Sequence, residues 1–301
     1  MKTVILEDES LRDGLQFEKQ VVSTQKKLEL FNHLVRAGVS RIQVGSFVNP
    51  KVVPQMGDTD EFVALVKQTP GVLVTGLVLN GRGLERAMAC GLEHISLSVS
   101  VSDAHSLKNV RKSYGDALDS VTELIRQAVQ AGIKVRAGAQ CAFGCIYEGV
   151  IPEQRVLEAL ESMAGAGAAE FNLADTTGMA NPFQVKELTT KVGQAFPEVG
   201  ISLHLHDTRG LAVANMVAGY EAGVRIFDTS AGGLGGCPFV KGAAGNIATE
   251  DAVNLFESMA VDTGIDLEKI CQVAETYEQL LGRNLPGRMG RVLQVQKTCE
   301  G

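Results

Sequence analysis

Two histidines, His204 and His206, stand two residues apart in a run that is typical of a β-strand. Alternate residues of a strand point to the same face, so we expect the two imidazole rings side by side, with Leu205 directed the other way. Two neutral imidazoles placed like this can bind a divalent metal ion, and the chain contains only five histidines. The alternative is a pair of structural or substrate-contacting histidines.

Asp13 and Asn246 are the natural oxygen ligands for such an ion. Asp13 follows the first expected strand and Asn246 follows the last, and these two strands are neighbours if the strands close into a barrel. Two nitrogen and two oxygen ligands, with further positions left for water, suit Mg²⁺ or Mn²⁺ and would also accept Zn²⁺ or Fe²⁺.

Arg12 and Cys237 are further candidates for chemistry. A guanidinium group is planar and permanently charged, so Arg12 could hold a carboxylate or a developing enolate through two hydrogen bonds, although a surface ion pair is the simpler alternative. Cys237 lies in the glycine-rich segment GGLGGCP, which we expect to act as a lid that closes over substrate and carries an acid–base group. The same loop could cradle phosphates, but no Lys-Ser/Thr pair follows it.

The spacing of the glycines predicts the strands and helices that must position these residues. A glycine followed by an apolar residue opens a β-rich run seven times, in most cases after a helix-like segment, at Gly38, Gly71, Gly91, Gly132, Gly167, Gly200 and Gly223. Glycine is expected just past a helix end, because it adopts the left-handed conformation without a Cβ penalty. With an opening strand over residues 3–6, the pattern predicts eight strands alternating with helices, the (β/α)8 TIM barrel. An open doubly wound sheet is less favoured, because no G-x-G-x-x-G follows the first strand.

The unusual polar residues fall where a barrel places its chemistry, at the C-terminal ends of the strands. We expect substrate contacts there from Gln16, Gln43, Ser46, Asn172 and Thr176, and Asp207 follows the two histidines. The chain reads as one domain over residues 1–301, with the barrel to about residue 264. A helical extension at residues 265–301 would consist of a helix over 267–281 and a loose tail.

Composition excludes several classes of protein. The 301 residues carry 28 Lys and Arg against 35 Asp and Glu, a formal net charge of −7, which argues against binding to nucleic acid or to an anionic membrane. No segment approaches the ~18 apolar residues of a membrane span, and six cysteines are too sparse for a disulfide framework. We therefore expect a cytoplasmic protein, and a homodimer is the default assembly for a barrel of this size.

Several strings in the chain resemble the 3-hydroxy-3-methylglutaryl-CoA (HMG-CoA) lyase family of metal-dependent barrel lyases. The matching strings span nearly the whole chain and are RDGLQFEK (12–19), SFVNPKVVPQM (46–56), CAFGCIYEG (141–149), DTTG (175–178), HLHDT (204–208) and GGLGGCPFVKGAAGNIATED (232–251). The last of these is the most specific for the lyases rather than for the related condensing enzymes.

The resemblance implies a reaction and a set of roles. The reaction is the cleavage of HMG-CoA to acetyl-CoA and acetoacetate, with a coenzyme A thioester as the substrate. The implied metal ligands are Asp13, His204, His206 and Asn246. Arg12 would stabilise the enolate, Cys237 would transfer a proton, and Lys19 would contact coenzyme A. The base that takes the hydroxyl proton would be Asp207, His204 or a water molecule.

Three departures from the family pattern bear on the substrate. The lyases usually have Glu at the position of Gln43 and Ser at the position of Asn172, and the strand exit reads DESLRDGLQ, closer to the condensing enzymes. These changes leave the metal set intact, so a different 3-hydroxyacyl-CoA or a citramalyl-type thioester is an alternative substrate. A barrel that binds acyl-CoA with little or no turnover is a third interpretation.

Overall fold

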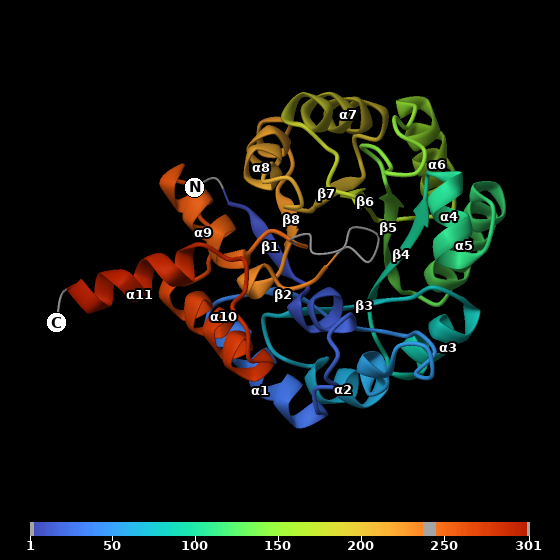
Figure 1. Ribbon diagram of the computed structural model, residues 1–301. Helices are drawn as coiled ribbons and strands as arrows, with labels where there is room; N and C mark the ends of the chain where they lie inside the picture. The colour runs from blue at the N-terminus through green and yellow to red at the C-terminus, as the bar shows by residue number, and fades with distance from the viewer. Residues whose placement is uncertain (1–2, 237–244, 300–301) are drawn as a thin grey trace.

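Eight parallel strands form a closed barrel at the centre of the molecule (Figure 1). In this computed structural model, which describes residues 3–236 and 245–299, each strand pairs with the next along the chain, and β8 pairs with β1. The strands are β1 (Ile5–Asp8), β2 (Arg41–Ser46), β3 (Leu73–Leu77), β4 (His94–Ser100), β5 (Lys134–Gln140), β6 (Glu170–Asp175), β7 (Gly200–Leu205) and β8 (Ile226–Thr229). The predicted TIM barrel is confirmed.

Helices surround the barrel, as Figure 1 shows. They are α1 (Thr24–Arg36), α2 (Thr59–Val66), α3 (Gly81–Ala89), α4 (Asp103–Val110), α5 (Tyr114–Gln130), α6 (Glu153–Gly165), α7 (Pro182–Ala195), α8 (Ala212–Glu221), α9 (Thr249–Ser258), α10 (Leu267–Leu281) and α11 (Met289–Cys299). None of the helices in these described ranges is long and apolar enough to cross a membrane. The apolar faces of most of these helices pack on the outside of the barrel and form one continuous hydrophobic core with it, whereas α11 projects away from the barrel (Figure 1).

The junction glycines mostly have the predicted backbone conformation. Six of the seven have φ between 69° and 101°, the left-handed region that favours glycine. At Gly38 a Cβ atom would also collide with the carbonyl oxygen of Gly264, so the close approach of two chain segments requires glycine as well. Gly200 differs, because it is the first residue of β7 rather than a helix cap.

The first strand lies two residues later than predicted, at Ile5–Asp8 instead of residues 3–6. Glu7 and Asp8, which lie beyond the predicted end of the strand, belong to it, and both side chains are fully buried. Glu7 accepts a hydrogen bond from the Thr75 hydroxyl and forms an ion pair with Arg136, with 2.8 Å between charged atoms. The strand therefore extends through Glu7, because Arg136 compensates its charge inside the barrel. Without such a partner, a charged residue usually indicates that a buried strand has ended.

The C-terminal extension is helical in both of its parts. The predicted helix over 267–281 is confirmed as α10, but the expected loose tail is wrong, because α11 occupies Met289–Cys299. The carboxylate of Asp251 accepts hydrogen bonds from the backbone N–H groups of Arg288 and Met289, at 2.9 and 2.8 Å. These bonds satisfy N–H groups that a helix start leaves without partners, and they anchor α11 to α9.

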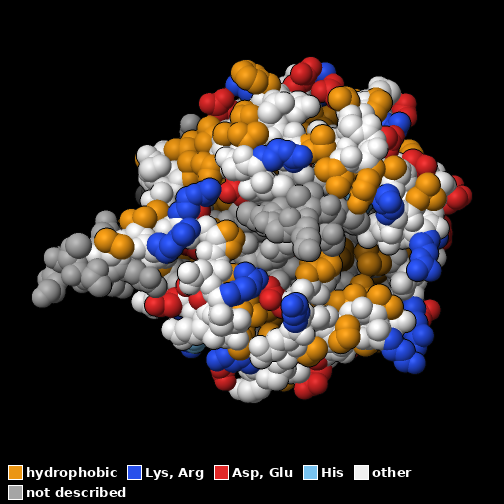
Figure 2. All heavy atoms as spheres, in the orientation of Figure 1, with side chains coloured by type: hydrophobic (Ala, Val, Ile, Leu, Met, Phe, Trp, Pro, Cys, Tyr) orange, Lys and Arg blue, Asp and Glu red, His pale blue; other side chains and the backbone are white. Residues whose placement is uncertain are grey.

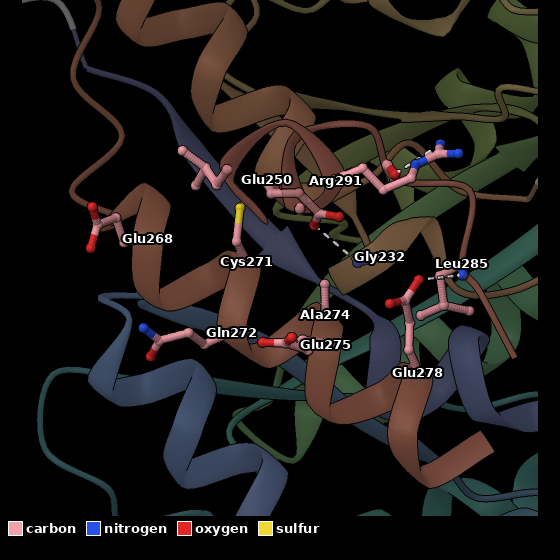
Figure 3. Close-up of a pocket in the computed structure, with 13 residues that line it drawn as sticks. Gly232, Glu250, Glu268, Cys271, Gln272, Ala274, Glu275, Glu278, Leu285 and Arg291 are labelled. Atoms are coloured by element: carbon pink, nitrogen blue, oxygen red, sulfur yellow. Dashed lines mark hydrogen bonds between the residues drawn. The ribbon is translucent and has the colours of Figure 1, made fainter. Parts of the chain in front are cut away.

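Two buried contacts connect these C-terminal helices to the end of the barrel where β1 and β8 exit. The hydroxyl group of Tyr277 in α10 lies 2.9 Å from that of Ser10, just after β1. Glu250 in α9 accepts a hydrogen bond of 2.9 Å from the N–H of Gly232, in the turn after β8 (Figure 3). α10 thus supports the segment that follows β1, and α9 supports the segment that follows β8.

Glu250 generates a prediction on the pH dependence of stability. Burial raises the pKa of its carboxyl group from 4.5 to about 8, although the Gly232 N–H opposes this. Between these pH values the folded protein binds a proton that the unfolded chain releases, so the free energy of unfolding falls as the pH rises, by at most about 1.4 kcal/mol per pH unit.

Glu250→Gln should remove this term, because the amide keeps an acceptor oxygen and does not titrate. In urea unfolding at pH 5, 6.5 and 8, we expect the variant to gain stability relative to the natural protein as the pH rises. A constant difference between the two proteins across this range would contradict the assignment.

Candidate active site

The predicted site residues gather around one cavity of about 570 Å³ at the C-terminal ends of the strands. Of the residues singled out in the sequence, eight line it: Arg12, Asp13, Gln16, Gln43, Asn172, Thr176, His204 and His206. They come from the ends of β1, β2, β6 and β7, which are far apart in the sequence. The barrel closure predicted from the glycine pattern is what brings them together.

A single π-helical turn, Ser10–Gly14, presents Arg12 and Asp13 to the cavity. The carbonyl of Glu9 accepts hydrogen bonds from the N–H groups of Arg12 and Gly14, at 3.0 and 3.1 Å. The Arg12 guanidinium donates to the Asp13 carboxylate at 2.6 Å, and its Nε donates to Oε1 of Gln43. Turns of this type often occur at functional sites.

The two histidines face each other as the sequence predicts. Nε2 of His204 and Nε2 of His206 lie 3.0 Å apart. His206 comes directly after β7 and forms a β-bridge with Asn246, which brings the last predicted ligand to the same place. The other ring nitrogen of His204, Nδ1, lies 3.2 Å from the carboxylate of Asp228 in β8.

These residues fit a divalent cation. One ligand atom each from Asp13, His204 and His206 lie within 4.8 Å of one another. Nδ2 of Asn246 donates to Asp13 at 2.7 Å, while its buried Oδ1 has no hydrogen-bond partner among the described residues. Two facing imidazole nitrogens, a carboxylate and an unpartnered amide oxygen form the donor set that Mg²⁺ or Mn²⁺ accepts.

The protonation states of these groups also favour a cation. Burial and the neighbouring His204 lower the pKa of His206 to about 3, so this ring is neutral at physiological pH. Burial would raise the pKa of Asp13, but Arg12 and the two histidines outweigh it and hold this carboxyl below its ordinary value. A charged carboxylate and a neutral imidazole are the forms that bind metal.

His204 behaves differently from its neighbour. Burial lowers the pKa of this ring, but the hydrogen bond to Asp228 and the negative charge of Glu9 raise it above the ordinary histidine value. Asp228 itself has a pKa well below its usual range, because the nearby Arg136 outweighs the effect of burial. Asp228 therefore fixes the orientation of the His204 ring and increases its basicity, as carboxylates behind metal-binding histidines do.

In the wall of the cavity and beneath it, ion pairs connect eight residues that we call the interior charge network. Its members are Glu7, Glu9, Asp13, Glu170, Asp228, Arg12, Arg41 and Arg136. Arg136 is the centre, with Asp228 at 2.7 Å, Glu7 at 2.8 Å and Glu9 at 3.0 Å. Five carboxylates face three guanidinium groups, so the fully ionised network carries two surplus negative charges.

Glu9, Arg136 and Asp228 were not predicted from the sequence, although all three line the cavity. A signal was present, because Arg136 and Asp228 are charged residues in the interior of two strands. Which charges pair across the barrel depends on closure and register, and the sequence pattern does not contain that information.

Four of the predicted residues that the structure describes do not line the cavity: Ser46, Lys19, Asp207 and Asn246. Ser46 is buried at the end of β2, and Lys19 is exposed on the surface. Oδ2 of Asp207 lies 3.2 Å from the Arg288 guanidinium, and its Oδ1 accepts from the N–H of Ala212 at 3.1 Å. Cys237 lies outside the described residues.

Comparison with known proteins decides the family. The sequence profile of the HMGL-like family matches residues 3–276. A hydroxymethylglutaryl-CoA lyase of Bacillus subtilis, YngG, is 39% identical over 297 residues, which are 99% of this chain and 98% of its own. The chain belongs to the HMGL-like family. It is a carbon–carbon lyase of the acyl-CoA class.

Two further lyases are similar to the chain over nearly their whole length. The (R)-citramalyl-CoA lyase of Chloroflexus aurantiacus is 38% identical over 301 residues, covering 97% of this chain and 95% of its own. An HMG-CoA lyase from Acinetobacter baumannii, solved with coenzyme A and 3-methylmalate, superposes with a TM-score of 0.90 at 38% identity. That match covers 96% of this chain and 94% of the other.

Asp228 generates a prediction on metal affinity. Asp228→Asn keeps an oxygen that can accept from His204 Nδ1 but removes the charge that raises the basicity of the ring. We expect Mn²⁺ affinity, measured by isothermal titration calorimetry on metal-free protein, to fall about 10- to 100-fold. Glu170→Gln is the matched control, because it removes a network carboxylate that does not line the cavity. Equal losses in both variants would count against a specific role for Asp228.

Proposed function

We propose that this protein cleaves 3-hydroxy-3-methylglutaryl-CoA to acetyl-CoA and acetoacetate. The observation that carries the proposal is the position of Arg12, whose guanidinium lies beside Asp13 in a cavity that also holds the two facing histidines. This cavity combines a cation that can stabilise an enolate with ligands that can hold a divalent metal ion. The names of the hydroxymethylglutaryl-CoA lyases among the relatives support the choice of substrate.

The reaction moves one proton and breaks one carbon–carbon bond. A base takes the proton of the C3 hydroxyl group, the C3–O bond becomes a carbonyl, and the electrons of the C2–C3 bond pass to the thioester enolate. Asp13, His204, His206 and Asn246 would hold a Mg²⁺ or Mn²⁺ ion, which supplies Lewis-acid polarisation of the hydroxyl and carboxylate oxygens when bound. A proton then returns to C2 and gives acetyl-CoA.

Asp207 and His204, the two side chains that are candidates for the base, differ in their position relative to the cavity. The carboxylate of Asp207 is engaged by Arg288 and by the start of α8, so it is not directed at the substrate. His204 lines the cavity, and Asp228 at its Nδ1 leaves Nε2 as the atom that accepts a proton or binds the metal ion. We favour the ligand role for His204, with a water molecule in the cavity as the acceptor of the proton.

Arg12 acts at the bond-breaking step. Its guanidinium donates hydrogen bonds to the oxygen of the thioester enolate, where negative charge develops. A preorganised donor of this kind typically contributes about 3–4 kcal/mol to the stabilisation of a transition state. Cys237, which lies outside the described residues, is proposed from the family resemblance as the group that returns the proton to C2.

The coenzyme A part of the substrate must bind to a protein with a formal net charge of −7. Figure 2 shows Lys and Arg side chains and hydrophobic side chains around the centre of one face. In the described residues, Lys108 and apolar groups such as Phe17 and Val52 line the cavity. These groups suit a phosphorylated, partly apolar chain, and Lys19 is proposed from the resemblance alone.

A citramalyl-type thioester is the second candidate substrate. Gln43 and Asn172, the two departures from the HMG-CoA lyase pattern, both line the cavity. The side chain of Asn172 is larger than that of serine. It donates hydrogen bonds to Asp228 and to Ser202, both at 3.0 Å, which hold the amide in place. A citramalyl group has one methylene fewer than a hydroxymethylglutaryl group, and a smaller acyl pocket would favour it.

A thioester panel tests the proposed function. Purified protein with Mg²⁺ or Mn²⁺ is incubated with HMG-CoA, citramalyl-CoA and longer 3-hydroxyacyl-CoA esters, and acetyl-CoA is quantified by mass spectrometry. We expect release from HMG-CoA that stops when EDTA removes the metal ion. No release from any panel member would overturn the proposal, and release from citramalyl-CoA alone would select the second candidate.

Asn172→Ser tests the origin of the acyl preference. The smaller side chain makes room for one more methylene, which a pocket discriminates by about tenfold or more. We expect the ratio of kcat/KM for HMG-CoA to that for citramalyl-CoA to rise about tenfold. An unchanged ratio would show that Asn172 does not determine the substrate.

A further inference from the structure

Glu9 is a fully buried carboxylate in the cavity wall, and it joins two arginines. Its Oε2 accepts a hydrogen bond from Nη2 of Arg12, and its Oε1 lies 3.0 Å from Nη2 of Arg136. The backbone of Glu9 is fixed as well, because its N–H donates to the carbonyl of Thr229 in β8 at 2.8 Å. Main-chain and side-chain contacts together determine where this carboxylate lies.

The guanidinium of Arg12 is held at all three of its nitrogens. Glu9 binds Nη2, Asp13 binds Nη1 and Gln43 binds Nε. Contacts at three nitrogens fix the plane of the group as well as its position. A guanidinium has five N–H donors, so the contacts made by the described residues leave one donor on each Nη for an oxygen atom of the substrate.

The three partners of Arg12 differ in the charge that they offer. Gln43 is neutral. Asp13 is a predicted metal ligand, and its other oxygen accepts from Asn246 at 2.7 Å. A bound cation would draw the negative charge of Asp13 toward itself and weaken its attraction for Arg12. Glu9 is then the carboxylate that continues to hold the guanidinium.

We propose that Glu9 is a positioning residue that holds the Arg12 guanidinium where the enolate oxygen forms. This inference rests on the proposed function, because it assumes that Arg12 stabilises an enolate. Without Glu9, Arg12 would be free to rotate about its contacts with Asp13 and Gln43. Hydrogen bonds weaken steeply when the donor is misaligned, so a small rotation would reduce catalysis without closing the cavity.

Glu9→Gln is the variant that tests the inference with the least change in shape. A glutamine has one acceptor oxygen and so cannot serve both Arg12 and Arg136, and its NH2 group would face one of the two guanidinium groups. We expect kcat to fall about a hundredfold, the loss typical when one electrostatic contact in a transition state is disturbed. The KM should change by less than about threefold.

A second variant tests whether the charge acts through Arg12. In the double variant Glu9→Gln with Gln43→Glu, a carboxylate returns to the same guanidinium, now at Nε. We expect kcat to recover at least about tenfold over the single variant, roughly half of the loss on a logarithmic scale. A purely structural role for Glu9 predicts no recovery.

Glu170→Gln is the matched control. Glu170 is also a buried carboxylate, and it pairs with the Arg41 guanidinium at 2.8 and 2.9 Å, but it does not line the cavity. Its kcat should stay within about twofold of the natural protein, even if its melting temperature falls. A loss equal to that of Glu9→Gln would overturn the inference, because the effect would then belong to any buried carboxylate.

The outcomes separate this inference from the proposed function. If the natural protein releases no acetyl-CoA from any thioester, the proposed function fails, and a crystal structure of Glu9→Gln still tests the positioning of Arg12. We expect the guanidinium to leave its place beside Asp13 and Gln43 in that structure. An unmoved Arg12, or an unchanged kcat in an active protein, would overturn the inference.

Discussion

The surplus of negative charge inside the barrel is the constraint on which the rest of the site depends. Burial of an ion costs several kcal/mol unless an opposite charge compensates it. The interior charge network sets three arginines against five carboxylates, so two negative charges are surplus when every group is ionised. These charges lie next to two histidines, at the position where a divalent cation would restore neutrality.

The pKa values of the network follow from this arrangement. Arg136 and Arg12 keep the pKa values of Asp228 and Asp13 low, so these carboxylates remain charged. Burial, which has the largest effect, and the charge of Asp228 together raise the pKa of Glu9 to about 7. The neighbouring arginines lower this pKa but do not fully offset the increase. The site therefore combines strongly held charges with one carboxylate whose charge responds to its surroundings. Arg12 belongs to the same network, so catalysis and charge balance depend on the same contacts.

The sequence predicted the architecture better than it predicted the network. Glycine junctions such as Gly38 reflect local backbone geometry, which a sequence records directly, and they led to the barrel. The spacing of His204 and His206 placed two rings on one face for the same reason. Arg136 and Glu9 became neighbours only through the closure of the barrel, since they are 127 residues apart. The helix α11 was missed because its first turn depends on Asp251, a tertiary contact.

A crystal structure of the protein soaked with Mn²⁺, with anomalous scattering data, tests the central claim most directly. The account predicts one ion per chain, within about 2.2 Å of ligand atoms from Asp13, His204, His206 and Asn246. The second cluster of possible ligand atoms, from Glu9, His204 and Asp228, should remain empty, because the oxygens of its two carboxylates are already engaged by Arg12 and Arg136. An ion in that second cluster, or no ion at either place, would contradict the account.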